Sequence, residues 1–94
     1  MRVIGRLQLE AYIQNHADLR TQVDAWLCEV SEAVWKDTKP IKARYLSASF
    51  LSDNRVVFNL KGNRYRLLVK INYDLQIITI QKIGTHADYS KWNL

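Results

Sequence analysis

The chain has 94 residues, 48% of them hydrophobic, and a formal net charge of +5. This hydrophobic content excludes a disordered chain, and the length predicts one domain spanning residues 1–94. Cys28 is the only cysteine, so no internal disulfide can form, and we find no signal peptide or membrane-spanning apolar run. We therefore expect a cytoplasmic protein that makes no membrane contact.

The first half of the chain predicts a helical scaffold. Residues 1–4 form a short strand and residues 6–15 a short helix. Apolar residues then recur at helical spacing and predict a long amphipathic helix over residues 18–36. These residues are Leu19, Val23, Trp26, Leu27, Val30 and Val34. Pro40 cannot continue a helix, so we expect residues 41–53 to be a connecting loop.

The second half opens with a predicted β-hairpin. Residues 55–60 and 64–71 are rich in β-branched and aromatic residues, and the Gly62-Asn63 dipeptide between them is typical of a two-residue turn. If Lys61 and Arg64 flank the turn, the cross-strand pairs are Leu60/Tyr65, Asn59/Arg66, Phe58/Leu67, Val57/Leu68, Val56/Val69 and Arg55/Lys70. A one-residue slip would pair core side chains with solvent side chains, so the register is strongly specified.

This register divides the hairpin into an apolar face and a basic face, because alternate pairs share a face. The apolar face carries Val56, Phe58, Leu60, Tyr65, Leu67 and Val69. The basic face carries Arg55, Val57, Asn59, Lys61, Arg64, Arg66, Leu68 and Lys70. From residue 55 onward seven basic residues stand against two acidic ones, whereas residues 1–54 carry seven of each. A segregated basic surface is typical of polyanion binders, and RNA or DNA is the commonest polyanion.

A second turn at Tyr73-Asp74 predicts a third strand that ends at Ile83-Gly84. Either a two- or a four-residue loop opposes Ile71 to Gln76, so we expect this pair. Counting on from that pair, the neighbours are Ile78 beside Val69, Ile80 beside Leu67, Thr79 beside Leu68 and Gln81 beside Arg66. Asn59, Arg66 and Gln81 would then lie in one row across three strands.

The predicted order of elements is β-α-α-β-β-β. Both helices must cover the apolar face of a mostly antiparallel sheet, because that face needs burial. The basic face is then left open. We therefore expect an α+β domain of two layers.

Two segments of the basic half resemble the HigB toxin family. They are residues 57–67 (VFNLKGNRYRL) and residues 83–89 (IGTHADY), in that order. The family belongs to the RelE-like toxins of type II toxin–antitoxin systems, so the resemblance implies a RelE-like fold and an endoribonuclease that cuts mRNA, in most studied members in the ribosomal A site. It also implies three partners: mRNA, the ribosome and a HigA-like helix-turn-helix antitoxin.

RNA can be cut without a metal ion when its 2′-OH attacks the adjacent phosphorus, which gives a 2′,3′-cyclic phosphate and a free 5′-OH. A protein helps by accepting the 2′-OH proton, stabilising the charge of the transition state and protonating the leaving oxygen. The basic half holds two carboxylates and one histidine, too few for a Mg²⁺ or Zn²⁺ site. We therefore expect neither a metal nor a cofactor.

The candidate catalytic residues are Arg66, His86 and Tyr89. Arg66 lies at the centre of the basic face, its guanidinium fork can hold a phosphate through two hydrogen bonds, and the resemblance implies the same arginine. Histidine is the side chain that titrates nearest neutrality, which makes His86 a candidate acid or base. Tyr89 could supply a proton or stack on a base, and it shares a side with His86 if Thr85 opens a helical turn. The alternatives are a solvated arginine, a histidine that caps the strand end and a tyrosine that anchors the C-terminal segment.

The candidate RNA-binding residues are Asn59, Lys61, Arg64, Lys70, Gln81 and Lys91. Asn59 could orient Arg66 or bind a ribose, and the two cations that flank the turn could hold phosphates. Lys70, farther along the face, would act through its charge. The family pattern often has arginine at the position of Gln81, so charge stabilisation here would rest more heavily on Arg66. A solvated charged edge is the alternative for the lysines and Arg64.

Four other conspicuous side chains are expected to be structural. His16 lies between the two helices, as a surface or capping residue, and Trp26 and Trp35 belong to the core. Cys28 lacks a neighbouring histidine or basic residue and is not expected to be a nucleophile.

Two other functions fit the basic sheet face. One is an RNA- or ribosome-binding module without catalysis, and the other is a protein-interaction domain that receives an acidic partner. The substitutions His86→Ala and Arg66→Ala separate these functions, because a nuclease loses cleavage and keeps its affinity for the ribosome.

Overall fold

A computed structural model describes residues 1–94, the whole chain, as a mixed helix and sheet structure. In chain order the elements are β1 (Arg2–Ile4), α1 (Arg6–Ile13), the 3-10 helix η1 (Ala17–Leu19), α2 (Arg20–Glu32), α3 (Thr38–Arg44), β2 (Ser49–Leu51), β3 (Arg55–Leu60), β4 (Tyr65–Asn72), β5 (Ile77–Thr85) and α4 (His86–Lys91). The five strands form one sheet of order β1-β5-β4-β3-β2, in which only β1 and β5 are parallel. The α+β prediction is confirmed. None of the helices has the length and apolar character that a membrane crossing requires.

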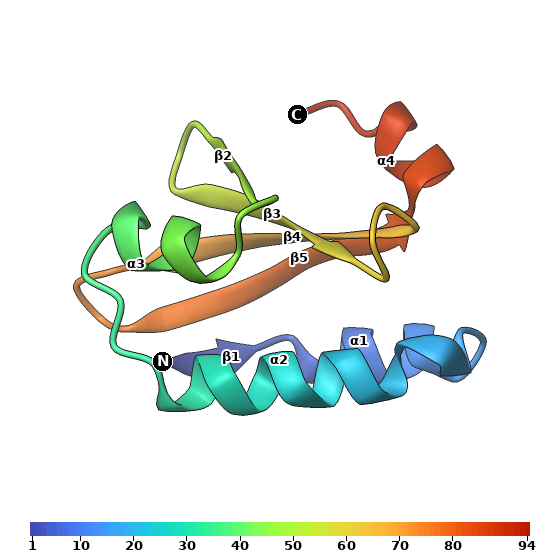
Figure 1. Cartoon of the computed structure of the whole chain (residues 1–94), viewed down its shortest axis with the longest axis horizontal. Coiled ribbons are helices and arrows are strands. Elements are labelled where there is room, and N and C mark those ends of the chain that lie inside the picture. Colours follow the sequence, from blue (N-terminus) through green and yellow to red (C-terminus); the bar gives the residue numbers. More distant parts are fainter.

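Helices α1 and α2 cover one face of the sheet (Figure 1). Leu9 of α1 and Val23 of α2 are fully buried in one cluster with the apolar face of the hairpin. Trp26 packs edge-on against Phe58, with ring centres 5.4 Å apart. Trp26 and Trp35 are 3% and 7% exposed, so the prediction that both belong to the core is confirmed.

The register of the first hairpin is as predicted in all six pairs, from Leu60/Tyr65 to Arg55/Lys70. The turn is closed by a hydrogen bond from the Arg64 N–H to the carbonyl oxygen of Lys61 at 3.2 Å. Lys61 and Gly62 have φ angles of +51° and +66°. Glycine adopts this left-handed conformation without steric cost, which explains its place in the turn.

The register of the second hairpin differs from the prediction, whereas the division into two faces is confirmed. Ile71 opposes Ile78 and not Gln76. The observed neighbours are Ile78/Ile71, Thr79/Lys70 and Ile80/Val69. Because the shift is two residues and side chains alternate along a strand, Ile78 and Ile80 still point into the core, where they are 0% and 5% exposed.

Side-chain hydrogen bonds explain the longer loop between β4 and β5. Asn72 Oδ1 accepts from the N–H of Leu75 at 2.9 Å. Gln76 Nε2 donates to the carbonyl oxygens of Tyr73 and Trp35, both at 2.7 Å. These bonds hold a four-residue loop over residues 73–76, one residue later than the four-residue loop that would oppose Ile71 to Gln76.

A β-bulge at Gln81 shifts the pairing by one further residue. The pairs on either side are Ile80/Val69 and Lys82/Leu68, so Gln81 has no partner in β4. Arg66 consequently lies opposite Gly84 and not opposite Gln81. The predicted row of Asn59, Arg66 and Gln81 was therefore wrong in its third member.

The segment after α2 contains two elements that the sequence did not predict. Helix α2 ends at Glu32, and Val34, expected on its apolar side, is 70% exposed. Residues 41–53, expected to be a connecting loop, contain the end of α3 and all of β2. Pro40 does not end a helix but lies in the first turn of α3, where its missing N–H costs no intrahelical hydrogen bond. Asp37 caps that turn through the N–H of Lys39 at 2.9 Å.

The basic face of the sheet is covered at its centre, contrary to the expectation that it is open. Arg66 is 9% exposed, and Val57 and Leu68 on the same face are 1% and 2% exposed. Figure 1 shows α4 and the segment after it on the side of the sheet away from α1 and α2. The carbonyl oxygen of Leu94 accepts a hydrogen bond from Arg55 Nη2 at 3.1 Å, which holds this segment over β3.

Candidate active site

Arg66 and Tyr89 lie in contact on the sheet face turned away from α1 and α2. The Cζ atom of Arg66 stands 5.2 Å from the centre of the Tyr89 ring, within the range of a cation–π interaction. Arg66 Nη1 donates to the carbonyl oxygens of Asn63 at 2.8 Å and Tyr65 at 3.4 Å. These contacts fix the plane of the guanidinium and use only one of its three nitrogens.

Helix α4 folds back over β5 because Gly84 has no side chain. A Cβ atom at Gly84 would lie 2.9 Å from Asp88 Cβ and 3.0 Å from Trp92 Cζ2. A reciprocal capping box opens the helix: the Asp88 N–H donates to Thr85 Oγ1 at 3.1 Å, and the Thr85 N–H donates to Asp88 Oδ2 at 3.0 Å. This geometry sets the direction of α4 and so places Tyr89 over the sheet.

His86 is the first residue of α4 and is exposed. Its main-chain N–H donates to the carbonyl oxygen of Arg64 at 2.9 Å, which joins the start of α4 to the β3–β4 hairpin. The expected helical turn after Thr85 is present, and His86 and Tyr89 are three residues apart on it. The imidazole makes no hydrogen bond to another residue, so it is free to meet a bound molecule.

The β3–β4 hairpin carries three of the predicted RNA-binding residues near Arg66. Asn59 is paired with Arg66 across the strands, as predicted, and is partly buried. Lys61 and Arg64 are exposed at the turn. Arg64 Nη1 lies 3.5 Å from Asp18 Oδ2, and an exposed ion pair of this kind contributes little to stability. Arg64 can therefore exchange that carboxylate for a phosphate.

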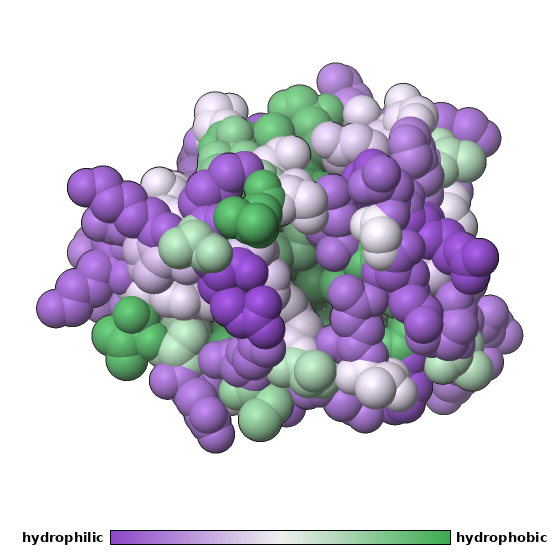
Figure 2. Space-filling model, in the orientation of Figure 1, coloured by the Kyte–Doolittle hydropathy of each residue, from purple (hydrophilic) through white to green (hydrophobic).

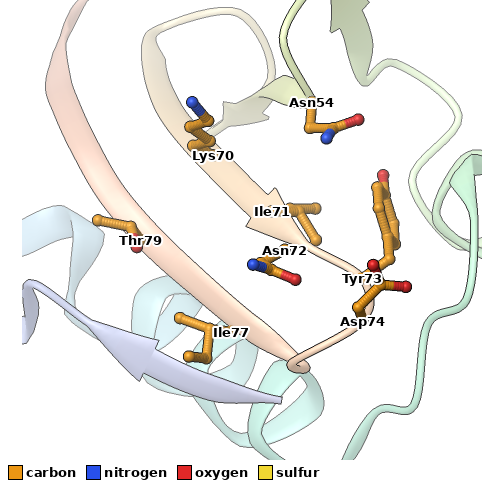
Figure 3. Close-up of a pocket in the computed structure, with 8 residues that line it drawn as sticks. All are labelled: Asn54, Lys70, Ile71, Asn72, Tyr73, Asp74, Ile77 and Thr79. Atoms are coloured by element: carbon orange, nitrogen blue, oxygen red, sulfur yellow. The ribbon is translucent and has the colours of Figure 1, made fainter.

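Lys70 lies at the other end of the sheet, where it forms an exposed ion pair with Asp53 at 3.0 Å. It borders a hollow of about 500 Å³ that the Arg66–Tyr89 pair does not touch (Figure 3). The lining residues are Asn54, Lys70, Ile71, Asn72, Tyr73, Asp74, Ile77 and Thr79. The mixture of one lysine with Asp74 and neutral side chains makes this hollow a poor phosphate site.

Gln81 and Lys91 are the remaining predicted RNA-binding residues, and both are exposed. Gln81 lies at the bulge, where its carbonyl oxygen accepts from Gln8 Nε2 at 3.1 Å. Lys91 is the last residue of α4, two residues after Tyr89. Lys91 therefore lies on α4 together with Tyr89, whereas Gln81 does not lie in one row with Arg66.

A second hollow, of about 200 Å³, lies between α2, α3 and β3, and hydrophobic atoms form its floor (Figure 2). Trp26, Tyr45 and Phe58 are among its apolar residues, and Asn59 is its one link to the predicted site. No group of three or more His, Cys, Asp or Glu side chains in the structure could hold a metal ion. Cys28 is exposed on α2, and His16 stacks on Tyr12 with ring centres 3.9 Å apart.

A family model described as HigB toxin, the RelE-like toxic component of a toxin–antitoxin system, matches residues 19–92. The chain belongs to the HigB toxin family. The matched range contains Arg66, His86 and Tyr89 and every element from α2 to α4. No curated protein matches the chain. Membership of a toxin–antitoxin family implies an antitoxin as partner.

The sequence of this HigB-family chain did not single out Trp92, which the structure places beside Tyr89, or Lys82, which lies beside Trp92. Trp92 follows Tyr89 by three residues, and their rings meet edge-on with centres 5.6 Å apart. The Nζ atom of Lys82 lies 5.7 Å from the centre of the Trp92 ring. The three-residue spacing of Tyr89 and Trp92 is a signal that the two rings lie on the same side of a helical turn. The face on which Lys82 lies depends on the bulge at Gln81, which has no such signal.

Asp88→Asn is expected to lower the thermal midpoint of the HigB-family chain near neutral pH and to have no such effect in acid. Hydrogen bonds from Thr85 hold the pKa of the Asp88 carboxyl below its ordinary value of 3.8. A carboxyl group with a depressed folded-state pKa stabilises the fold above its unfolded pKa, and that contribution is lost as the pH falls through the folded-state pKa. Thermal unfolding of both proteins across this range measures the difference, with Asp74→Asn as the control. A difference that stays constant down to the lowest pH would contradict the assignment.

Proposed function

We propose that this HigB-family toxin is an endoribonuclease that cuts mRNA by attack of a ribose 2′-OH on the adjacent phosphorus. The observation that carries the proposal is the contact between Arg66 and Tyr89 on the basic sheet face. Tyr89 lies on α4, the helix that begins with His86. A phosphate-binding guanidinium, a phenol and an imidazole are the groups that this reaction uses. The reaction as proposed needs no metal ion and no cofactor.

In the proposed mechanism Arg66 binds the scissile phosphate and stabilises the charge that develops on its oxygens. Its Nε and Nη2 atoms carry no hydrogen bond to the protein, so two donors of the fork remain for a bidentate contact. Arg66 is 9% exposed, so the phosphate must displace part of its cover. Tyr89, which is only partly buried, is the group that we expect to move.

His86 transfers a proton, either from the attacking 2′-OH or to the leaving 5′-oxygen. Tyr89 supplies the second proton transfer or stacks on a base next to the cut. Asn59 orients Arg66 or binds a ribose, while Lys61, Arg64 and Lys91 hold flanking phosphates. Lys70 contributes through charge from the far end of the sheet, whereas Gln81 is left with a peripheral contact to RNA.

The proposed setting is the cytoplasm, with mRNA cut in the ribosomal A site. We propose that a HigA-like helix-turn-helix antitoxin neutralises the toxin. The excess of basic residues from Arg55 onward supports contact with both mRNA and ribosomal RNA.

Primer extension on mRNA from cells that express the chain without an antitoxin tests the proposal. We expect growth arrest, together with new 5′ ends at defined positions within codons, and neither effect with His86→Ala expressed to the same level. Folded wild-type protein that leaves both growth and mRNA intact would contradict the toxin proposal.

A non-catalytic RNA- or ribosome-binding module is the second candidate, and the burial of Arg66 favours it. An arginine that is 9% exposed and bonded to two carbonyl oxygens is also suited to a structural role. This function predicts growth arrest with intact mRNA, and the same primer-extension experiment distinguishes it from cleavage.

A further inference from the structure

Four side chains form a continuous column on the covered sheet face, in which two aromatic rings lie between two cations. In order, they are Arg66, Tyr89, Trp92 and Lys82. Arg66 Cζ lies 5.2 Å from the Tyr89 ring centre, and the Tyr89 and Trp92 ring centres are 5.6 Å apart at 80°. Lys82 Nζ follows at 5.7 Å from the Trp92 ring centre. The column therefore leads from the proposed phosphate-binding residue to an exposed lysine.

Trp92 differs from the two other tryptophans of the chain in its access to solvent. Trp26 and Trp35 are 3% and 7% exposed in the core, whereas Trp92 is only partly buried. Its position is fixed at one edge, because Cζ2 packs where a side chain of residue 84 would lie. An aromatic ring that is held in place and partly open is suited to stacking, since every nucleobase has a π-face.

Lys82 supplies the charge that a nucleotide needs beside such a ring. Its side chain is exposed and takes part in no ion pair, and its contact with Trp92 at 5.7 Å is a loose one. A base that stacks on the ring can displace the ammonium group, which then lies within reach of the phosphate of the same nucleotide. Lys82 faces this way because the bulge at Gln81 pairs it with Leu68 on the covered face.

We propose that Trp92 and Lys82 form a nucleotide-binding subsite for single-stranded RNA beside Arg66. Trp92 stacks on the base of a nucleotide next to the scissile phosphate, and Lys82 contacts a phosphate of that nucleotide. This proposal rests on the proposed function and narrows it, because it assigns a base-stacking contact to one position of the RNA. Stacking of this kind changes RNA affinity roughly 5- to 100-fold per base.

Tryptophan fluorescence tests the subsite independently of cleavage. A short single-stranded RNA with 2′-O-methyl groups on every ribose binds without being cut, because it has no 2′-OH that could attack the adjacent phosphorus. We expect this probe to quench the emission of the wild-type chain, since Trp92 is the tryptophan that reaches solvent. The quenching should be lost with Trp92→Leu, and RNA affinity should fall roughly 5- to 100-fold and be largely restored with Trp92→Phe. Lys82→Ala should also weaken binding, whereas Lys36→Ala, at an exposed lysine outside the column, should not.

A change in the RNA tests the same contact and leaves α4 unaltered. RNAs that lack one base, at each position in turn, are titrated against the wild-type chain. One position should show the affinity loss, and the same RNA should show no further loss with Trp92→Leu. Unchanged emission at saturating RNA, or equal affinity for every base-deleted RNA, would overturn the subsite. Because the probe cannot be cut, binding without any cleavage of ordinary RNA would count against the nuclease and not against the subsite.

Discussion

Arg66→Lys is expected to lower the rate constant of RNA cleavage by about 10²–10³-fold, the usual effect of removing one preorganised donor from a charged transition state. Lysine keeps the positive charge and most of the stem, but it offers a point charge in place of a planar fork. The two nitrogens of Arg66 that are free of protein hydrogen bonds would have no equivalent. Single-turnover cleavage of ribosome-bound and free mRNA measures the loss.

The control for this prediction is Arg2→Lys, which makes the same replacement at an exposed position on β1. It should leave the rate unchanged. Thermal unfolding of the Arg66 variant shows whether the loss of the contact with Tyr89 has altered the fold. A folded Arg66→Lys protein that cleaves at the wild-type rate would assign Arg66 to structure alone.

His86→Ala is expected to lower the cleavage rate constant by about 10²–10⁴-fold, the range for the loss of one general acid or base. The fold should survive, because the side chain is exposed and the hydrogen bond to Arg64 comes from the main chain. RNA affinity, measured with the non-cleavable 2′-O-methyl probe, should change little. The variant thus separates proton transfer from binding.

The other histidine of the chain provides a matched control. His16→Ala removes a partly buried ring that stacks on Tyr12, so its expected effect is on stability and not on cleavage. If both histidine variants lost cleavage to the same extent, the loss would report a general disturbance and His86 would have no special part. An unchanged rate in His86→Ala would remove it from the mechanism.

The first hairpin could be predicted residue by residue because its information is local. The Gly62 turn fixes the loop, and the alternation of apolar and polar residues leaves one register that buries the core face. The second hairpin has the same alternation, but its loop is held by the side chains of Asn72 and Gln76. Patterning therefore gave the correct faces and the wrong partners.

The covered state of Arg66 could not be predicted because it depends on packing between distant segments. The fold of α4 over β5 requires the missing side chain of Gly84 and the placement of Trp92 against it. Neither residue has a periodic pattern that signals this contact. Helix α3 escaped prediction for a simpler reason: Pro40 stands in a first helical turn, where proline is tolerated, and sequence reasoning took it for a terminator.

The unpaired residue Gln81 lets β5 contain one extra residue and still keep its apolar side chains in the core. If Gln81 were instead paired with Leu68, Lys82 would lie opposite Leu67 and Ile83 opposite Arg66, which would turn a charge into the interior and Ile83 out of the core. Related proteins should therefore tolerate the loss of one residue at this point, because Ile80/Val69 and Lys82/Leu68 then become consecutive pairs of a regular ladder. A one-residue insertion, in contrast, would carry His86 and Tyr89 to the wrong side of the sheet unless a larger bulge took it up.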